Sequence, residues 1–246
     1  MTRASLHAPR RWTAPLAVAA VALTALAAAA AEPARPLRLF LLSGQSNMKH
    51  VDPEASFTPR VSAALPDCEV AVVKFAVSGQ LIRMWVHDWQ PPAGQQPAGQ
   101  GPNGRHYDAL LRLTRDALAD RPRPASVTLV WMQGEADANH PGYAELYPAA
   151  LHALLGQLRR DLGRDDVDMV LGRISDFGVG QPDRPGWDTI RAEQVKFVEQ
   201  DPDHRAWVDT DDLNGNSNGL HYTRRGYQLL GERFADAAVA LLKARP

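Results

Sequence analysis

Four short polar segments contain the residue types that a serine-dependent ester cleavage needs. They are Ser43–Met48, Val77–Gln80, Trp131–Asp137 and Asn218–Tyr222. Such a reaction uses a hydroxyl as the nucleophile, an imidazole that takes its proton, and hydrogen-bond donors around the oxyanion. It also needs a group that holds the imidazole in place. We therefore expect the four segments to meet at one catalytic site.

Each segment can supply one part of this chemistry. Ser46 is the expected nucleophile, and its N–H can point at the developing negative charge because it lies at an expected strand-to-helix junction. Gly79 can bring a second N–H close, since it has no side chain to obstruct the approach. The amide of Gln133 can supply a third donor, and His221 is the natural general base.

Five apolar runs and four helical stretches must position these segments. The expected strands are Leu37–Leu42, Val70–Val77, Ser126–Met132, Asp168–Ile174 and Arg205–Asp209, and the expected helices are His106–Asp120, Tyr143–Leu162, Trp187–Glu199 and Arg224–Lys243. Apolar runs without strict alternation are typical of parallel strands that are buried on both faces. The pattern predicts an α/β fold, a three-layer α/β/α sandwich around a mainly parallel five-stranded sheet. Active groups collect at the carboxyl ends of such strands, where the four polar segments stand.

One irregular stretch, Gln90–Gly104, contains four prolines, four glycines and four glutamines. It can be a surface loop without a role. Long loops in compact domains are often functional, so it can also form the rim of the site. The sequence does not decide between the two.

The first 31 residues are typical of an export signal and not of the fold. Arg3, Arg10 and Arg11 precede an apolar run that ends in small residues near Ala31. An uncleaved anchor is the alternative, but the run is shorter than the ~20 residues that a membrane span needs. We expect a signal peptide over residues 1–31, one domain over 32–246, and a secreted or periplasmic protein. Arg10-Arg11 leaves the choice of export route open.

The net charge bears on which partners the chain can bind, and the cysteine content bears on disulfide formation. The 27 basic and 28 acidic residues give a net charge of −1, and removal of three arginines with the signal makes it −4. Such a chain gives no electrostatic reason to expect nucleic acid or an anionic membrane as a partner. Cys68 is the only cysteine, so no intrachain disulfide can form. We see no metal-binding or phosphate-binding motif, and we expect no metal and no cofactor.

The quoted motifs are similar to those of a known family. GQSNM, SGQ, WMQGEAD and GLHYT resemble the sialate O-acetylesterase and acetylxylan esterase group of the SGNH (GDSL-like) hydrolases. The resemblance implies a flavodoxin-like fold, a serine nucleophile at Ser46, and an oxyanion hole completed by Gly79 and Gln133. It also implies an acetylated carbohydrate as the substrate.

The residue expected to hold the imidazole of His221 differs from the family pattern. The resemblance places an aspartate three residues before His221, and that position is Asn218 here. Glu135 is the first candidate, because the glutamate of QGE lies close to the histidine in this family. Asn218 could orient the ring through its amide. The remaining candidates are the aspartates before the last helix, Asp209, Asp211 and Asp212.

Four further residues are candidates for substrate contacts. Trp85 and Trp89 follow the Gly79 segment and could stack on a sugar ring, or they could belong to the core. Asn139 and His140 come shortly after the QGE segment and could touch the substrate.

These features predict a secreted serine esterase that removes acetyl groups from carbohydrate through an acyl-enzyme. One alternative keeps the catalysis but acts on lipid or aryl esters. Another is a carbohydrate-binding protein on a degenerate esterase fold, because the aspartate near His221 is missing. The expected partner is an acetylated carbohydrate, with no nucleic acid and no membrane after signal cleavage, and the oligomeric state is left open.

Overall fold

The computed structural model describes Met1, residues 34–215 and residues 219–244. The chain divides into a compact unit, Arg35–Pro246, and a separate N-terminal unit, Met1–Ala34. Apart from Met1, the expected signal segment lies outside the described residues, and so does Asn218. Within the described residues, no helix combines the length and the apolar character that crossing a membrane requires.

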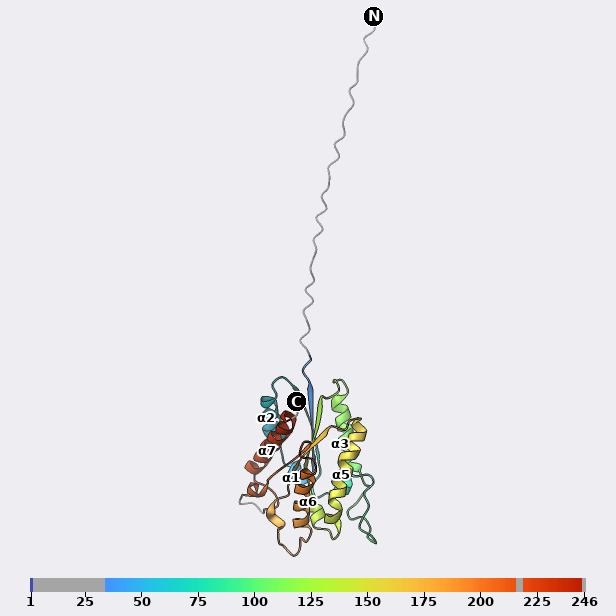
Figure 1. Ribbon diagram of the computed structural model, residues 1–246, viewed down its shortest axis with the longest axis vertical. Helices are drawn as coiled ribbons and strands as arrows, with labels where there is room; N and C mark the ends of the chain where they lie inside the picture. The colour runs from blue at the N-terminus through green and yellow to red at the C-terminus, as the bar shows by residue number, and fades with distance from the viewer. Residues whose placement is uncertain (2–33, 216–218, 245–246) are drawn as a thin grey trace. The chain divides into compact units, whose positions relative to one another are not determined.

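The compact unit is built on one parallel sheet of five strands (Figure 1). The strands are β1 (Leu37–Gly44), β2 (Glu69–Ala76), β3 (Ser126–Met132), β4 (Val167–Gly172) and β5 (Arg205–Val208). Their order in the sheet is β2-β1-β3-β4-β5, and every neighbouring pair is parallel. All residues of β3 and β4 are buried, as expected for strands covered on both faces. The predicted α/β class and five-stranded parallel sheet are confirmed.

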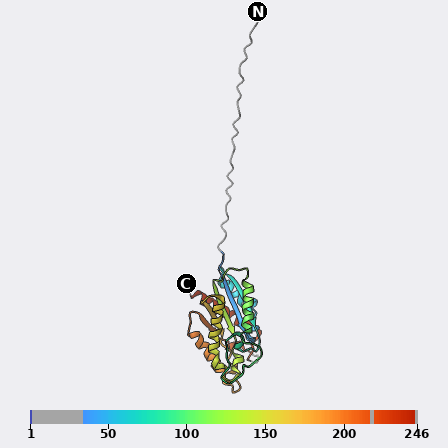
Figure 2. The same ribbon diagram turned by 90° about the vertical axis from the view of Figure 1, so that its right-hand side faces the viewer.

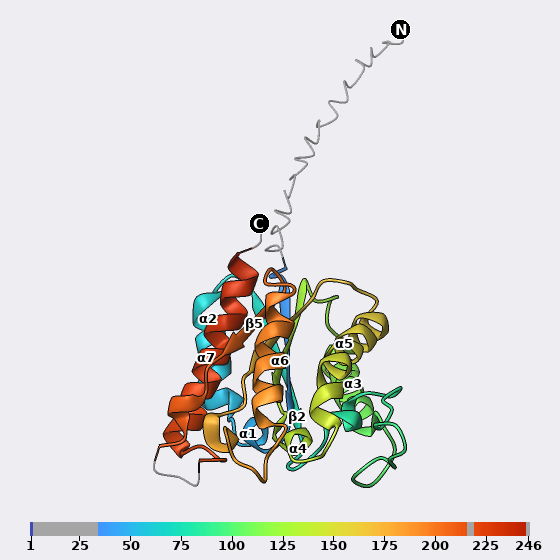
Figure 3. The ribbon, with the colours of Figure 1, turned by 60° about the horizontal axis from the view of Figure 1, so that its bottom comes forward.

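Helices cover both faces of this sheet. The longer ones are α2 (Thr58–Ala64), α3 (Arg105–Leu118), α5 (Tyr143–Leu162), α6 (Trp187–Glu199) and α7 (Arg224–Lys243). Helices α2 and α7 pack together on one side, whereas α3 and α5 lie on the other, and α6 packs against α5 and β5 (Figures 1, 2 and 3). The two layers enclose a single apolar core. The predicted three-layer sandwich is therefore confirmed.

Several short elements lie outside the predicted helices, although the start of α1 (Ser46–Lys49) agrees with the strand-to-helix junction expected at Ser46. They are α1, α4 (Glu135–Ala138), a π-helical turn η1 (Pro53–Phe57) and the 3-10 turns η2 (Ile82–Trp85), η3 (Asp176–Gly178) and η4 (Asp211–Leu213). One or two helical turns contain too few residues to show an apolar period. Side-chain capping supports two of them. At η1 the Asp52 side chain accepts hydrogen bonds from the N–H groups of Glu54 and Ala55, and at η3 the Ser175 side chain accepts from the N–H of Phe177.

Candidate active site

A cavity of about 420 Å³ lies where the carboxyl ends of the central strands meet the loop before α7. Figure 3 shows α1 and α4, which follow β1 and β3, at the same end of the sheet. The lining residues are Gln45, Ser46, His50, Ser78, Gly79, Glu135, Ala136, Asn139, His140, Leu220 and His221. The cavity thus contains residues from all four polar segments.

Ser46 is presented by a tight turn between β1 and α1. Gly44, the last residue of β1, has φ +138°, and a Cβ there would lie 2.0 Å from the Met132 carbonyl oxygen. The next residue, Gln45, donates its N–H to that oxygen over 2.9 Å. The turn therefore fits closely against the end of β3, and Ser46 becomes the first residue of α1, with only 7% of its surface exposed.

Ser46 and His221 are in direct contact. Ser46 Oγ and His221 Nε2 are 3.0 Å apart, which is hydrogen-bond distance. With a neutral imidazole protonated on Nδ1, the serine hydroxyl donates to Nε2, which is the arrangement that proton abstraction needs. The fold brings this pair together across 175 positions of sequence.

Two backbone N–H groups beside Ser46 are free to bind an oxyanion. Ser46 is the first residue of α1, so its N–H has no acceptor within the helix. Gly79 lies in an exposed turn with φ +66°, a conformation that favours glycine. Neither N–H donates a hydrogen bond to another described residue. Both residues line the cavity, so this part of the predicted oxyanion hole is brought together.

Gln133 does not reach the cavity. Its side chain is fully buried, and its amide nitrogen donates to the Gln80 carbonyl over 3.0 Å and to the Asp137 carboxylate over 2.5 Å. Both N–H bonds of the amide are therefore used, and the structure does not place Gln133 as the third oxyanion donor. The Asp137 carboxylate also accepts the N–H of Ile82, so this pair fixes the chain that follows Gly79.

The carboxyl group of Asp137 has a raised pKa. The side chain is completely buried at the start of α4. Burial raises its pKa to about 7, against the opposing effect of the hydrogen bonds from Gln133 and Ile82. Asp137 therefore changes its charge close to neutral pH, beneath the site.

Glu135 contacts Asn47 and not the histidine. Its Oε1 accepts a 2.8 Å hydrogen bond from Asn47 Nδ2, and its buried Oε2 has no partner among the described residues. Burial raises the pKa of this carboxyl, and the hydrogen bond from Asn47 opposes the shift. The expectation that Glu135 holds the imidazole of His221 is wrong in this structure, because the Asn47 amide takes the carboxylate.

The aspartates before α7 have arginine partners instead. Arg233 donates to both carboxylate oxygens of Asp212 over 2.6 Å, and Arg191 does the same to Asp211 over 2.7 and 2.8 Å. Asp209 accepts from Arg173. These pairings remove Asp212 and its neighbours as candidates for the histidine partner. The remaining candidate, Asn218, lies outside the described residues.

Asn47 is a site residue that the sequence reading missed. Besides its bond to Glu135, its Nδ2 donates to the Leu220 carbonyl over 3.0 Å, and its Oδ1 accepts the Tyr227 hydroxyl over 3.1 Å. It is 1% exposed. Asn47 therefore ties the nucleophile helix to α4, to the histidine loop and to α7. Its position directly after Ser46 in GQSNM was the available signal.

The expected substrate contacts divide into two groups. Asn139 and His140 line the cavity, as anticipated. Trp85 is fully buried, and its indole N–H donates to Ser43 Oγ over 3.0 Å. Trp89 is 5% exposed and packs on Tyr143. The prediction that Trp85 stacks on a sugar ring is therefore wrong, because its ring is buried in the core.

The stretch Gln90–Gly104 lies beside the Gly79 turn. Buried Arg83 donates to the Ala98 carbonyl over 2.6 Å and holds the stretch in place. Gly79 and Gly99 both line a small cavity of about 240 Å³. The stretch thus adjoins the catalytic cavity through Gly79, but none of its residues lines that cavity, so its role as a rim stays a prediction.

His50 is a third histidine at the cavity, besides His140 and His221, and the sequence alone assigns it no role. Its ring centroid is 6.1 Å from that of His221 and 5.2 Å from that of Tyr227. Burial, followed by the proximity of His221, lowers its pKa. Both effects favour the neutral ring of His50, which can accept or donate a hydrogen bond beside the site.

Comparison with known proteins gives one family match and several similar folds. The family described as carbohydrate esterase, sialic acid-specific acetylesterase, matches residues 49–240. No curated protein sequence matches the chain significantly. Solved structures of low sequence identity show the same fold.

Three of these structures illustrate the similarity. A protein from Arabidopsis thaliana has 20% identity over 85% of this chain and 98% of its own, with a TM-score of 0.64. A carbohydrate acetylesterase from Xanthomonas citri has 17% identity over 84% of this chain and 57% of its own, with a TM-score of 0.57. A carbohydrate acetylesterase from Sinorhizobium meliloti has 13% identity over 84% of this chain and 99% of its own, with a TM-score of 0.55.

Proposed function

Because this chain belongs to the carbohydrate esterase family of sialic acid-specific acetylesterases, we propose that it is a serine esterase that removes O-acetyl groups from carbohydrate. The observation that carries the proposal is the 3.0 Å hydrogen bond between Ser46 Oγ and His221 Nε2. A nucleophile and a base at this distance, beside two unused N–H donors, fit acyl transfer to serine.

The proposed reaction proceeds in two halves. Ser46 Oγ attacks the acetyl carbonyl while His221 Nε2 accepts the hydroxyl proton. The tetrahedral intermediate collapses as that proton passes to the leaving sugar oxygen, and the acetyl group stays on Ser46. A water molecule then gives a proton to the same nitrogen and attacks the acyl-enzyme. Acetate leaves, and the proton returns to Ser46.

The negative charge that develops on the carbonyl oxygen is held by the N–H groups of Ser46 and Gly79. The N-terminal end of α1 adds the favourable partial charge of unpaired amide groups. Removal of one oxyanion donor typically costs on the order of a hundredfold or more in rate. Gln133 and Asp137 act indirectly in this scheme, by fixing the chain that follows Gly79.

The first test compares serine variants of the purified chain without residues 1–31. We expect cleavage of p-nitrophenyl acetate, a loss of at least a thousandfold in kcat for Ser46→Ala, and no loss for Ser62→Ala, an exposed serine on α2. Full activity of Ser46→Ala would overturn the assignment. A wild-type chain that binds saccharide but releases no acetate would point to a degenerate binding protein.

Substrate class needs a separate measurement. We expect activity to fall sharply for acyl chains longer than acetyl, because the matching family is one of acetylesterases. Activity that rises with acyl length would favour a lipid esterase instead. Acetate release from acetylated xylan, acetylated sialic acid and acetylated pectin then ranks the carbohydrate classes.

Export is part of the proposal as well. Arg3, Arg10 and Arg11, followed by the apolar run, support a signal peptide over residues 1–31 and a secreted or periplasmic mature protein. N-terminal sequencing of the protein from the periplasmic or medium fraction tests this, and an intact N-terminus in the cytoplasmic fraction would contradict it.

A further inference from the structure

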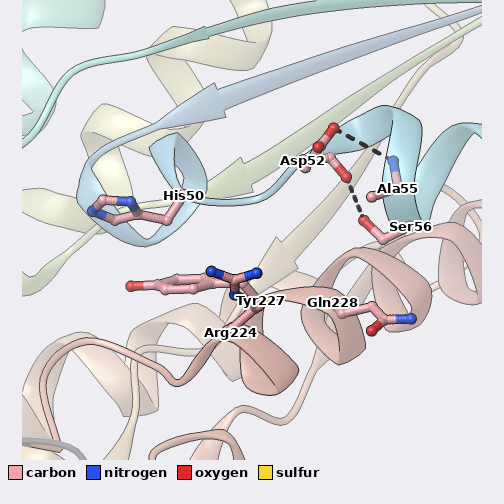
Figure 4. Close-up of a pocket in the computed structure, with 7 residues that line it drawn as sticks. All are labelled: His50, Asp52, Ala55, Ser56, Arg224, Tyr227 and Gln228. Atoms are coloured by element: carbon pink, nitrogen blue, oxygen red, sulfur yellow. Dashed lines mark hydrogen bonds between the residues drawn. The ribbon is translucent and has the colours of Figure 1, made fainter.

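A second and larger cavity, of about 680 Å³, opens beside the catalytic one. Figure 4 shows the side chains that line it: His50, Asp52, Ala55, Ser56, Arg224, Tyr227 and Gln228. They come from the end of α1 and from η1 on one wall and from the first turns of α7 on the other. The reaction proposed above uses none of these residues.

Both walls of this cavity are fixed by contacts within the fold. Ser56 Oγ donates to the Asp52 carbonyl over 2.7 Å (Figure 4), and a Cβ at Gly231 of α7 would lie 2.0 Å from that hydroxyl. Glycine therefore allows α7 to pack closely on η1. On the other wall, the Tyr227 hydroxyl donates to Asn47. The cavity is thus preformed, which lowers the cost of binding a ligand.

His50 joins this cavity to the catalytic one, because it lines both. Its ring centroid is 6.1 Å from that of His221 and 5.2 Å from that of Tyr227. A substrate with its acetyl group at Ser46 can therefore extend past His50 to Tyr227.

The lining has the chemistry of a sugar-binding surface. Arg224 is exposed and makes no ion pair with a described residue, so its guanidinium is available as a donor. Across the cavity, the Asp52 carboxylate accepts two backbone N–H groups through Oδ1 and can accept further bonds. The Tyr227 and His50 rings add partly apolar faces. Opposed donor and acceptor charges suit a neutral unit with many hydroxyl groups better than an anion.

We propose that this cavity is a second sugar subsite, which binds a neutral glycosyl unit next to the acetylated unit at Ser46. The enzyme then prefers acetylated oligosaccharides to acetylated monosaccharides. This inference rests on the proposed esterase function for its kinetic readout. Binding of the sugar can also be measured without catalysis.

The kinetic test compares O-acetylated xylose with O-acetylated xylotetraose, each relative to p-nitrophenyl acetate. We expect kcat/KM for the tetrasaccharide to exceed that for the monosaccharide at least tenfold. Arg224→Ala should reduce this preference roughly tenfold, the effect of losing one charge-assisted hydrogen bond. Ala55→Trp, which fills the cavity from an exposed position, should reduce it through a higher KM. The matched control is Arg225→Ala, because Arg225 is exposed but lies outside the cavity lining.

Three outcomes would overturn the subsite. One is equal kcat/KM for the two chain lengths, and another is an equal effect of Arg224→Ala and Arg225→Ala. The third is a preference for acetylated oligogalacturonate that Arg224→Ala removes, since that would make the occupant anionic. If no ester is cleaved, the esterase proposal fails, and calorimetric titration with unacetylated xylotetraose decides the subsite. Binding that Arg224→Ala weakens supports it, and absence of binding rejects it.

Discussion

The side-chain amide of Asn47 donates a 2.8 Å hydrogen bond to the buried carboxylate of Glu135. The same nitrogen donates to the carbonyl of Leu220, the residue before His221. The residue after the nucleophile therefore positions the loop that carries the base, and Glu135 fixes the amide that does so. In this arrangement Glu135 supports the proposed catalytic pair through Asn47 and not through the imidazole.

Replacement of Asn47 tests this arrangement. Asn47→Ala removes the side-chain hydrogen bond to the buried Glu135 carboxylate, which costs about 1–3 kcal/mol of unfolding free energy. It also frees the histidine loop, so we expect kcat to fall at least tenfold with little change in KM. Urea unfolding and p-nitrophenyl acetate kinetics measure the two effects.

Glu135 variants separate a positioning role from a charge role. Glu135→Gln keeps an oxygen that can accept from Asn47, so we expect less than a tenfold loss of kcat. Glu135→Ala removes the acceptor and should behave like Asn47→Ala. A loss near 10⁴-fold in Glu135→Gln would instead indicate a charge that orients and stabilises the imidazolium.

Stability should depend on pH through Asp137. Its folded pKa, about 7, is raised above the ordinary value of 3.8, so the folded state holds a proton that the unfolded state loses. The stabilisation that Asp137 contributes is fully present below pH 3.8. It is lost progressively as the pH rises from 3.8 through about 7. Over that window the loss is on the order of 4 kcal/mol.

The measurement compares the unfolding free energy of wild type and Asp137→Asn from pH 4 to 8. The asparagine cannot ionise and can still accept the N–H of Ile82, so the variant should gain relative stability as pH rises. A difference between the two proteins that stays constant with pH would show that Asp137 does not titrate in this range.

Much of the fold could be predicted from the sequence. The bounds of α5, α6 and α7 agree with the predicted helices, because their buried residues recur at helical spacing. The strand β3 also has its predicted bounds, since all seven of its residues are buried. A periodic or continuous apolar pattern in a long element is enough to predict the residues at which the element begins and ends.

The site could be predicted only in part. Ser46, Gly79, Asn139, His140 and His221 do line one cavity, because strand-end segments of a parallel sheet meet at one edge. The hydrogen-bond partners of the buried polar groups could not be predicted from the sequence in this way. Gln133 donates to Asp137, four residues further on, and this pairing depends on the turn between β3 and α4. Glu135 bonds to a residue 88 positions away, which no local pattern indicates.

The burial of Trp85 and its hydrogen bond to Ser43 could not be predicted from the sequence either. The role of this side chain can be tested. Trp85→Phe removes the N–H that Ser43 Oγ accepts and leaves a gap in the core. We expect a loss of about 1–3 kcal/mol in unfolding free energy and an unchanged KM for acetylated oligosaccharide. Trp207→Phe, on the partly exposed β5, is the control. A higher KM with unchanged stability would return Trp85 to the role of a sugar-stacking ring.

The turn that presents Ser46 leaves no room for a side chain at Gly44. At Gly44 an alanine Cβ would lie 2.0 Å from the Met132 carbonyl oxygen, and that oxygen belongs to the backbone of β3, which cannot move aside cheaply. Gly44→Ala must therefore separate the end of β1 from β3 and displace Ser46 from His221. We expect a loss of roughly 2–4 kcal/mol in stability and of at least a hundredfold in kcat, because a displacement of about 1 Å at a reacting group has an effect of that size.

The matched control for this variant is Gly180→Ala. Gly180 also has a positive φ, +67°, but nothing lies within 4 Å of its Cβ position. Its replacement incurs only the backbone strain, about 1–2 kcal/mol, and should leave kcat unchanged. If the two variants lose equal stability and Gly44→Ala keeps its activity, then the close fit of the turn against β3 does not position the nucleophile.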